Sequence, residues 1–472
     1  MKAEDFGPEI GIVASGSTAV SAPIVLNQRV EDLVEDEQLA VISDPAFSNR
    51  LFFSVVRKLT RYEPFLRERV RSVYVDYPDV LDKSLVMPFS NAQLNIYGIL
   101  DLDKKRFREN TIAPHPGSKV YLVERGALLE EFFSTGVSAL NVGEHKYSGW
   151  SIPLDHTKLN CHIGVFGATG TGKSRLIRAL VDEIVSKTDS SLIVFDHTGV
   201  DYAPFYQGKS IPSSSLTISP AIVASVLCDL ARLSWQTFGE YLEISCVKYH
   251  DEAKEKGWSR EGFMRQLEQT MKSLGARPQT IEKAKIFIEK FVPSTFFSDL
   301  SARRITPRQL IEKALREKLV VVDLSADREL IVKQAVVRDV LEEGWKLIKE
   351  RQAPINLGVV IDEAQNYAPE GWTLCGEAVE TVAREGRKWR FFIVLASQRV
   401  ARDIRTTVRA NLGTVFFSKL QATGDLREIG GYMDLAGLTD ASLAQLGERE
   451  FFVAGLINPL RRPLLLKVKE VT

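Results

Sequence analysis

Cysteine is scarce in this sequence, and no long apolar run occurs in it. The four cysteines are scattered and form no C-x-x-C pair, which favours free thiols over a disulfide framework or a zinc site. No apolar run approaches the roughly 20 residues that span a bilayer. The acidic segment 1–8 also lacks the apolar core of a signal peptide. These absences predict an intracellular, cytoplasmic protein without a membrane segment.

The sequence also lacks an excess of either charge. Lys and Arg together number 61, as do Asp and Glu, so the formal net charge is zero. A neutral chain gives no indication of nucleic-acid binding through its bulk charge. It does not exclude such binding, because a ring-shaped protein can enclose a basic channel within an acidic exterior. With 472 residues, the chain is long enough for more than one hydrophobic core.

The first 150 residues contain short apolar runs separated by Gly, Pro, Asp and Asn. Closely spaced runs of this kind predict short strands and a small β-barrel over residues 1–150. The clearest helical piece is Ala127–Phe133. The runs are Ile10–Val13, Leu39–Ser43, Val70–Val75, Leu94–Leu100 and Lys119–Val123.

From residue 151 to 472 strands and helices alternate, which predicts an α/β domain with a mostly parallel sheet. Residues 215–313 interrupt the alternation and predict a helical insertion, and residues 450–472 predict two β runs that pair antiparallel. The predicted parallel strands are His162–Phe166, Ser191–Phe195, Leu319–Leu324, Gly358–Ile361, Phe391–Ala396 and Thr414–Phe417. The predicted helices are Lys173–Ser186, Arg328–Lys349, Trp372–Lys388 and Ala401–Ala410.

A complete G-x-x-x-x-G-K-[ST] pattern follows the first of these strands, and a helix is predicted directly after it. That setting lets glycine N–H groups and the helix N-terminus surround phosphates. It predicts that Lys173 contacts the β- and γ-phosphates of ATP and that the Ser174 hydroxyl binds Mg²⁺. The nucleotide-binding residues are Gly167, Thr169, Gly170, Thr171, Gly172, Lys173 and Ser174.

The apolar strand that ends at Ile361 leads into Asp362 and Glu363. At the carboxyl end of the sheet, Asp362 can hold Mg²⁺ through water, and Glu363 can act as a general base on the attacking water. No Asn-Lys-x-Asp motif for guanine is present. The pattern therefore favours ATP over GTP and predicts hydrolysis.

Three further positions leave alternatives open. Asp196 ends the second strand and could be a competing carboxylate or could hold the following turn. Gln398 follows a strand end and could sense the γ-phosphate. The basic helix end that contains Arg384 and Arg387 could supply an arginine finger or could simply complement the helix dipole.

Several of these blocks together resemble the HerA family of hexameric DNA translocases, in the FtsK–HerA superfamily of P-loop NTPases. The matching blocks, in order and spacing, are Gly167–Ser174, Val360–Gln365, Val382–Lys388 and Ala396–Arg399. Phe195–Tyr202 looks like that family's Asp-x-His-Gly-Glu-Tyr turn. The amino-terminal region is similar to the barrel that precedes HerA cores.

The resemblance implies a RecA-like ATPase core in a homohexameric ring, with ATP sites between subunits and double-stranded DNA in the central channel. It also implies a NurA-type nuclease partner in DNA end resection and repair. By position, Asp362 and Glu363 take the Walker B role. Arg387 matches the trans-acting arginine, with Arg384 as the fallback, and Gln398 matches the sensor.

Two residues depart from the family pattern. Cys161 stands where an arginine is often found, just before His162, which we expect to be structural. Gln365 replaces the histidine of the family's Glu-Ala-His. The change at Gln365 could mark a divergent branch of the family. Two other roles also stay open: a ring scaffold that controls an effector nuclease, and a DNA-pumping ATPase of conjugation or plasmid transfer.

Overall fold

A computed structural model describes residues 1–63, 71, 73–80, 89–133, 139–422 and 424–470. The chain divides into two compact units: residues 1–156 together with 430–472, and residues 157–429. Among the described residues, no helix combines the length and the apolar character needed to cross a bilayer.

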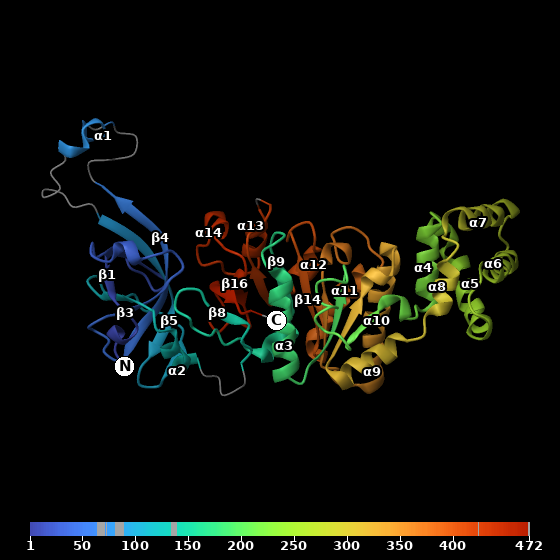
Figure 1. The fold of residues 1–472 in the computed structure, drawn as a ribbon, viewed down its shortest axis with the longest axis horizontal. Coiled ribbons are helices and arrows are strands. Elements are labelled where there is room, and N and C mark those ends of the chain that lie inside the picture. Colours follow the sequence, from blue (N-terminus) through green and yellow to red (C-terminus); the bar gives the residue numbers. More distant parts are fainter. Residues whose placement is uncertain (64–70, 72, 81–88, 134–138, 423, 471–472) are drawn as a thin grey trace. The chain divides into compact units, whose positions relative to one another are not determined.

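The amino-terminal part of the first unit is a closed antiparallel barrel (Figure 1). Its strands follow one another in the order β2-β1-β7-β3-β4-β5, and β2 pairs with β5 to close the ring. Aliphatic side chains from alternate positions, such as Ile10, Ile24 and Leu94, fill the interior. The predicted barrel is confirmed. Its strands are β1 (Glu9–Val13), β2 (Ser21–Leu26), β3 (Leu39–Ser43), β4 (Arg50–Tyr62), β5 (Phe89–Asp101) and β7 (Lys119–Leu122), with β6 (Arg106–Arg108) added beside β5.

One predicted strand of this unit is wrong. Within the run Val70–Val75, the described part forms the helical turn α1 (Val73–Asp76), and residues 70 and 72 lie outside the described residues. The turn belongs to the connection between β4 and β5, which pair with each other as far as Tyr62 and Phe89. An apolar alternation alone could not exclude this. The helical piece expected near Ala127 is confirmed as η4 (Gly126–Leu129) and α2 (Glu130–Phe133).

The carboxyl-terminal residues group with the barrel. The strands β16 (Glu450–Gly455) and β17 (Leu464–Val468) pair antiparallel as predicted, and β17 also pairs with β8 (Gly143–His145). The buried Arg57 guanidinium joins this segment to the barrel, because it bonds Glu37 at 2.8 Å and the carbonyl oxygens of Ala436 and Pro463. These bonds between residues far apart in sequence hold 430–472 within this unit.

The second unit is built on a parallel sheet with the strand order β11-β12-β10-β13-β14-β9-β15. Its central strands are buried apolar runs, as the sequence predicted, and each adjacent pair is parallel. The strands are β9 (Ile163–Phe166), β10 (Ser191–Asp196), β11 (Ser210–Pro212), β12 (Leu319–Asp323), β13 (Leu357–Ile361), β14 (Phe391–Ser397) and β15 (Thr414–Phe417).

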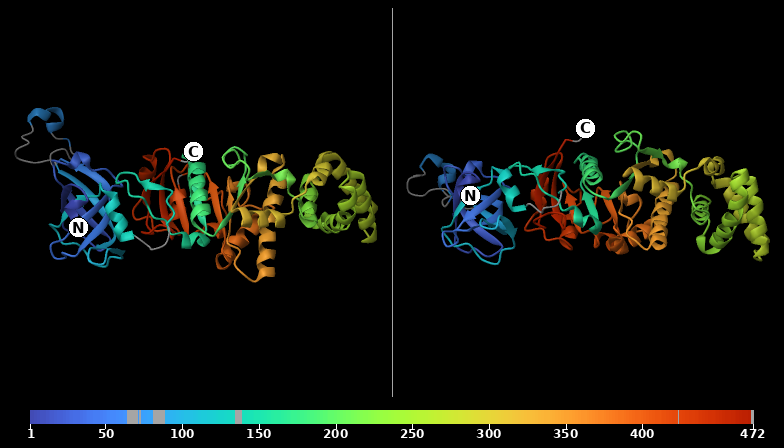
Figure 2. Two further views of the ribbon diagram at one scale, coloured as in Figure 1. Left: turned by 60° about the horizontal axis from the view of Figure 1, so that its bottom comes forward. Right: turned by 90° about the horizontal axis from the view of Figure 1, so that it is seen from below.

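Helices cover this sheet on both faces. The connections through α10 (Leu330–Arg351) and α11 (Gly376–Glu385) each lead to a strand nearer to β15. The connection through α3 (Lys173–Lys187) leads from β9 to β10, which is the opposite direction along the sheet. Right-handed crossovers therefore put α3 on the face opposite α10 and α11. The predicted helical insertion forms a group of its own within this unit, clear in both views of Figure 2. Its helices are α4 (Pro220–Leu230), α5 (Trp235–Lys256), α6 (Arg260–Ser273), α7 (Pro278–Phe291) and α8 (Phe296–Ala302). The last helix of the predicted insertion, α9 (Pro307–Glu317), packs instead against α10, β10 and β12.

Two predicted helices are shorter than expected. The helix predicted over 372–388 begins only at Gly376, because Thr373 Oγ1 bonds the Tyr367 carbonyl at 2.9 Å and the Leu374 N–H bonds a glutamine side chain. The helix predicted over 401–410 is reduced to α12 (Thr406–Arg409). There the buried Arg409 guanidinium takes up the carbonyl oxygens of residues 400 and 404. Tertiary bonds thus replace helical ones in both segments.

Candidate nucleotide-binding and hydrolysis site

The phosphate-binding loop connects β9 to α3. Gly170 and Gly172 have φ values of +80° and +94°, a left-handed conformation that favours glycine. Two backbone hydrogen bonds connect the loop to neighbouring parts of the sheet. The Gly167 N–H donates to the Ser397 carbonyl at 3.3 Å, and the Ala168 N–H donates to the Lys419 carbonyl at 2.7 Å. The curled backbone and the amino terminus of α3 thus meet at the carboxyl edge of the sheet, as an anion site requires.

Side chains of the loop line this edge. Lys173 Nζ donates to the carbonyls of Gly167 at 2.8 Å and Ala168 at 3.2 Å. Burial lowers the pKa of Lys173, and the charges of the nearby carboxylates oppose that shift. Thr171 Oγ1 donates to the Ala168 carbonyl at 2.8 Å, so its hydroxyl hydrogen is already bonded within the loop. Thr169 Oγ1 donates to Gln398 Oε1 at 3.4 Å, which brings the predicted sensor to the loop.

The strand β13, neighbour of β14, delivers the two adjacent carboxylates. Asp362 is only 4% exposed, and burial, followed by the charge of Glu363, raises its pKa to about 7. Glu363 has a φ of +46°, a left-handed conformation that is unfavourable for a residue with a side chain. Its N–H bonds Asp362 Oδ1 at 2.9 Å, and its carbonyl accepts from the Asn366 N–H at 2.9 Å. Both backbone groups of Glu363 are therefore fixed.

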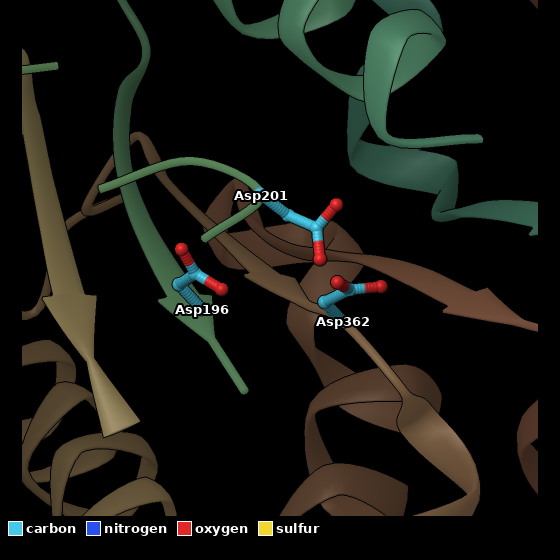
Figure 3. A group of neighbouring side chains, drawn as sticks. All are labelled: Asp196, Asp201 and Asp362. Carbon is cyan, nitrogen blue, oxygen red and sulfur yellow. The ribbon is translucent and has the colours of Figure 1, made fainter. Parts of the chain in front are cut away.

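Three aspartates converge beside the loop (Figure 3). Carboxylate oxygens of Asp196, Asp201 and Asp362 all lie within 4.8 Å of one another. Ser174 Oγ donates to Asp201 Oδ1 at 2.8 Å, so the hydroxyl predicted to bind Mg²⁺ already points into this group. Hard oxygen donors gathered beside a P-loop fit a magnesium ion.

Asp196 and Asp201 have different surroundings. Asp196 accepts backbone N–H bonds from Thr198, Gly199, Tyr202 and Ala203, at 2.9 to 3.3 Å, which are the bonds of a residue that holds the following turn. That leaves Ser174, Asp201 and Asp362 as the donors available for a cation. Asp201 was not among the site residues predicted from the sequence. The sequence feature that could have identified Asp201 is its position in the Phe195–Tyr202 block, where it is the acidic residue just before the tyrosine.

The predicted arginines lie at the other edge of the sheet. Arg387 is exposed in the turn η9 (Gly386–Trp389), just before β14, whereas Gln398 follows that strand. Because β14 and β9 run parallel, with Ser397 opposite Phe166, the P-loop lies at the end where β14 finishes. From Phe391 to Ser397 the seven residues of β14 make six steps of about 3.3 Å, so the two edges lie about 20 Å apart. Arg384, at the end of α11, is likewise on the side that precedes β14.

The residues before the P-loop strand have structural contacts. His162 Nδ1 accepts the Ile393 N–H at 3.2 Å, and burial lowers the pKa of this histidine to about 4. The Cys161 carbonyl accepts the Gly413 N–H at 2.6 Å. Asn160 Nδ2 donates to the Arg387 carbonyl at 3.1 Å and so joins the arginine-bearing turn to the segment that enters β9.

Comparisons with known proteins agree with this fold. Residues 140–344 match the family model described as the central domain of the helicase HerA. The probable helicase MJECL08 of Methanocaldococcus jannaschii is 24% identical over 421 residues, which cover 80% of this chain and 79% of that protein. The DNA double-strand break repair helicase HerA of Sulfolobus acidocaldarius is 22% identical over 487 residues, covering 97% of this chain and 92% of that protein.

A solved structure, VirB4 of Thermoanaerobacter pseudethanolicus, aligns with a TM-score of 0.52 at 16% identity, over 71% of this chain and 97% of that one. At this identity the likeness concerns the fold. The fold and the motifs are those of a P-loop protein. Within that class, the chain carries the HerA central domain and is a distant relative of HerA helicases over nearly its full length. The resemblance inferred from the motifs is confirmed.

Proposed function

We propose that this chain is an ATP-driven translocase or helicase of double-stranded DNA, which works as a homohexameric ring beside a NurA-type nuclease in DNA end resection and repair. The observation that carries the proposal is the assembled carboxyl edge, where the P-loop, Asp362, Glu363 and Gln398 meet. The similarity to proteins named as helicases supports a DNA substrate.

In this proposal the residues of the carboxyl edge divide the chemistry of ATP hydrolysis. Lys173 leaves the loop carbonyls to bind the β- and γ-phosphates. Ser174, Asp201 and Asp362 would hold Mg²⁺, which when bound offsets phosphate charge. Glu363 accepts the proton of the attacking water. Gln398, already bonded to the loop, detects the loss of the γ-phosphate.

Arg387 completes the site of a neighbouring subunit. The support is its position: about 20 Å of strand separate it from the P-loop of its own chain, more than a side chain can bridge. It is exposed, as a residue that reaches another subunit must be. A ring in which the amino edge of one sheet faces the carboxyl edge of the next brings the two together, which is a head-to-tail interface.

The proposal is tested by measuring ATP turnover of the purified chain with and without linear double-stranded DNA. We expect stimulation by DNA and loss of all turnover in Lys173→Ala, which removes the charge that anchors the phosphates. DNA binding should show little sequence preference and weaken steeply with salt, because it depends on phosphate contacts.

Other outcomes separate the alternatives. Turnover indifferent to DNA would favour a ring scaffold that controls an effector nuclease. DNA stimulation without any action on free duplex ends would favour a DNA-pumping ATPase of conjugation or plasmid transfer. Unchanged turnover in Lys173→Ala would remove the proposal altogether.

A further inference from the structure

A short chain of hydrogen bonds begins at the carboxylate of Glu363. Gln365 Nε2 donates to Glu363 Oε2, and Gln365 Oε1 accepts a hydrogen bond from Ser397 Oγ at 3.0 Å. The same serine hydroxyl lies 2.6 Å from Asp403 Oδ2, which also accepts the Arg399 N–H at 3.0 Å. The chain therefore connects the Walker B segment to the end of β14 and the segment after it.

The chemistry of these groups fixes which way the amide faces. A carboxylate only accepts hydrogen bonds, so the NH₂ group of Gln365 has to face Glu363. The carbonyl oxygen of the amide then faces Ser397. Ser397 has a single hydroxyl hydrogen and two acceptors within reach, Gln365 and Asp403. Position 365 thus requires a donor toward Glu363, and its carbonyl oxygen shares the Ser397 hydrogen with Asp403.

The backbone leaves Gln365 as the group that restrains the Glu363 side chain. Both backbone polar groups of Glu363 are already bonded, in a left-handed conformation that sets the direction of its Cα–Cβ bond. What remains free is rotation about the side-chain bonds. The bond from Gln365 to Oε2 limits that rotation.

We propose that Gln365 is a positioning residue, which holds the Glu363 carboxylate in the orientation that accepts a proton from the attacking water. The inference rests on the proposed function, because it concerns the same hydrolytic site. Charged and titratable groups near the two ends of the amide are Glu363 and Asp403, with Lys173, Asp362 and His197 around the Glu363 carboxylate. An amide orients a carboxylate among these groups without titrating itself.

The test measures kcat and KM for ATP in wild type, Gln365→Leu and Gln365→His, each with linear DNA at saturation. Leucine has similar volume but neither donor nor acceptor. Since a hydrogen bond to a charged group is at stake, we expect kcat to fall by about tenfold to a hundredfold in Gln365→Leu. KM should stay within about threefold of the wild-type value, because the substrate contacts are untouched.

Gln365→His is the matched variant. A neutral imidazole offers one donor and one acceptor, so it can replace the amide and should restore most of kcat at pH 8. Near its ordinary pKa of about 6.5 the imidazole gains a second proton. It then has no acceptor for Ser397 and pairs with Glu363 as an ion. Its pH–rate profile should therefore have an acid limb near that pH which the wild-type profile lacks.

A double-mutant cycle with Glu363→Gln isolates the contact. In that background, Gln365→Leu should lower the residual single-turnover rate by less than about twofold, since the carboxylate that it orients is gone. Additive losses would overturn the inference. So would an unchanged or faster kcat in Gln365→Leu, or a Gln365→His variant that is folded but as slow as the leucine variant at pH 8. Absence of turnover in the wild type would instead contradict the proposed function.

Discussion

In the proposed ring, replacing Arg387 by alanine should abolish most ATP turnover while leaving assembly and ATP binding intact. The reason is the position of this side chain at the edge of the sheet opposite its own P-loop, across the seven residues of β14. Arginine fingers contribute about 10³ or more to turnover in other NTPases, because they offset charge on the transferring phosphoryl group. We expect a loss of that order, with ATP affinity nearly unchanged.

Mixing experiments distinguish action on a neighbour from action within one subunit. Arg387→Ala subunits keep an intact P-loop, and Lys173→Ala subunits keep an intact arginine. In a ring with head-to-tail interfaces, random mixing of equal amounts puts about one quarter of the interfaces in the productive order. Turnover should therefore reappear in mixed rings, at up to about that fraction of the wild-type rate if the sites act independently.

Arg384→Ala is the matched control for this experiment. Arg384 is an exposed arginine three residues earlier, at the end of α11. Its replacement should leave turnover within about twofold, as for most surface changes. If the loss appears in Arg384→Ala, the finger is Arg384. If verified mixed rings stay inactive, or Arg387→Ala alone is fully active, the reasoning from the sheet edges is refuted.

Three further predictions concern single sites. Glu363→Gln should retain ATP and lower turnover by about 10² or more, whereas Asp196→Asn should act mainly on stability; a larger catalytic loss in Asp196→Asn would reverse the roles. Asp201→Asn should raise the Mg²⁺ concentration needed for half-maximal turnover, and an unchanged Mg²⁺ titration would exclude it as a donor. Burial lowers the pKa of His145 to about 4, so the unfolded state binds its proton first as the pH falls from about 6.5. Unfolding free energy should drop by up to about 3 kcal/mol toward pH 4, and less in His145→Gln, measured by denaturant unfolding at several pH values.

The parallel sheet could be predicted because its strands are buried on both faces and appear in the sequence as continuous apolar runs. Leu319–Asp323 is such a run, and its bounds differ from the prediction by one residue. The P-loop could be predicted because all of its chemistry is local in sequence. The lengths of the helices near the site could not be predicted. The side chains of Arg409 and Gln334 form hydrogen bonds with backbone groups that the local sequence pattern would place in helices.

The parts of the site that escaped prediction depend on partners far away in sequence. Asp201 is positioned in the site by a hydrogen bond from Ser174, which is 27 residues away in sequence. Gln365 gains its place from Ser397, which is 32 residues away. Neither contact has a periodicity or a spacing that a single sequence could reveal. The departure at Gln365 was visible as a change from the family's histidine, but only the bonds on its two sides give that change a chemical meaning.

The adjacent strands β13 and β14 each end at a pair of consecutive residues, and the two residues of each pair make different contacts. At the end of β13, Asp362 joins the oxygen donors beside Ser174, while the left-handed backbone of Glu363 directs the next carboxylate to Gln365. At the end of β14, Ser397 bonds that same glutamine, while Gln398 bonds the P-loop. A movement of β14 relative to β13 would therefore change the support of Glu363, the proposed base, and the contact with the phosphate loop together. Because the arginine-bearing turn precedes β14 directly, the proposed engagement of Arg387 with a neighbour's nucleotide would act on the same strand. In the proposed ring, the strand thus offers one physical route by which successive subunits could hydrolyse ATP in order.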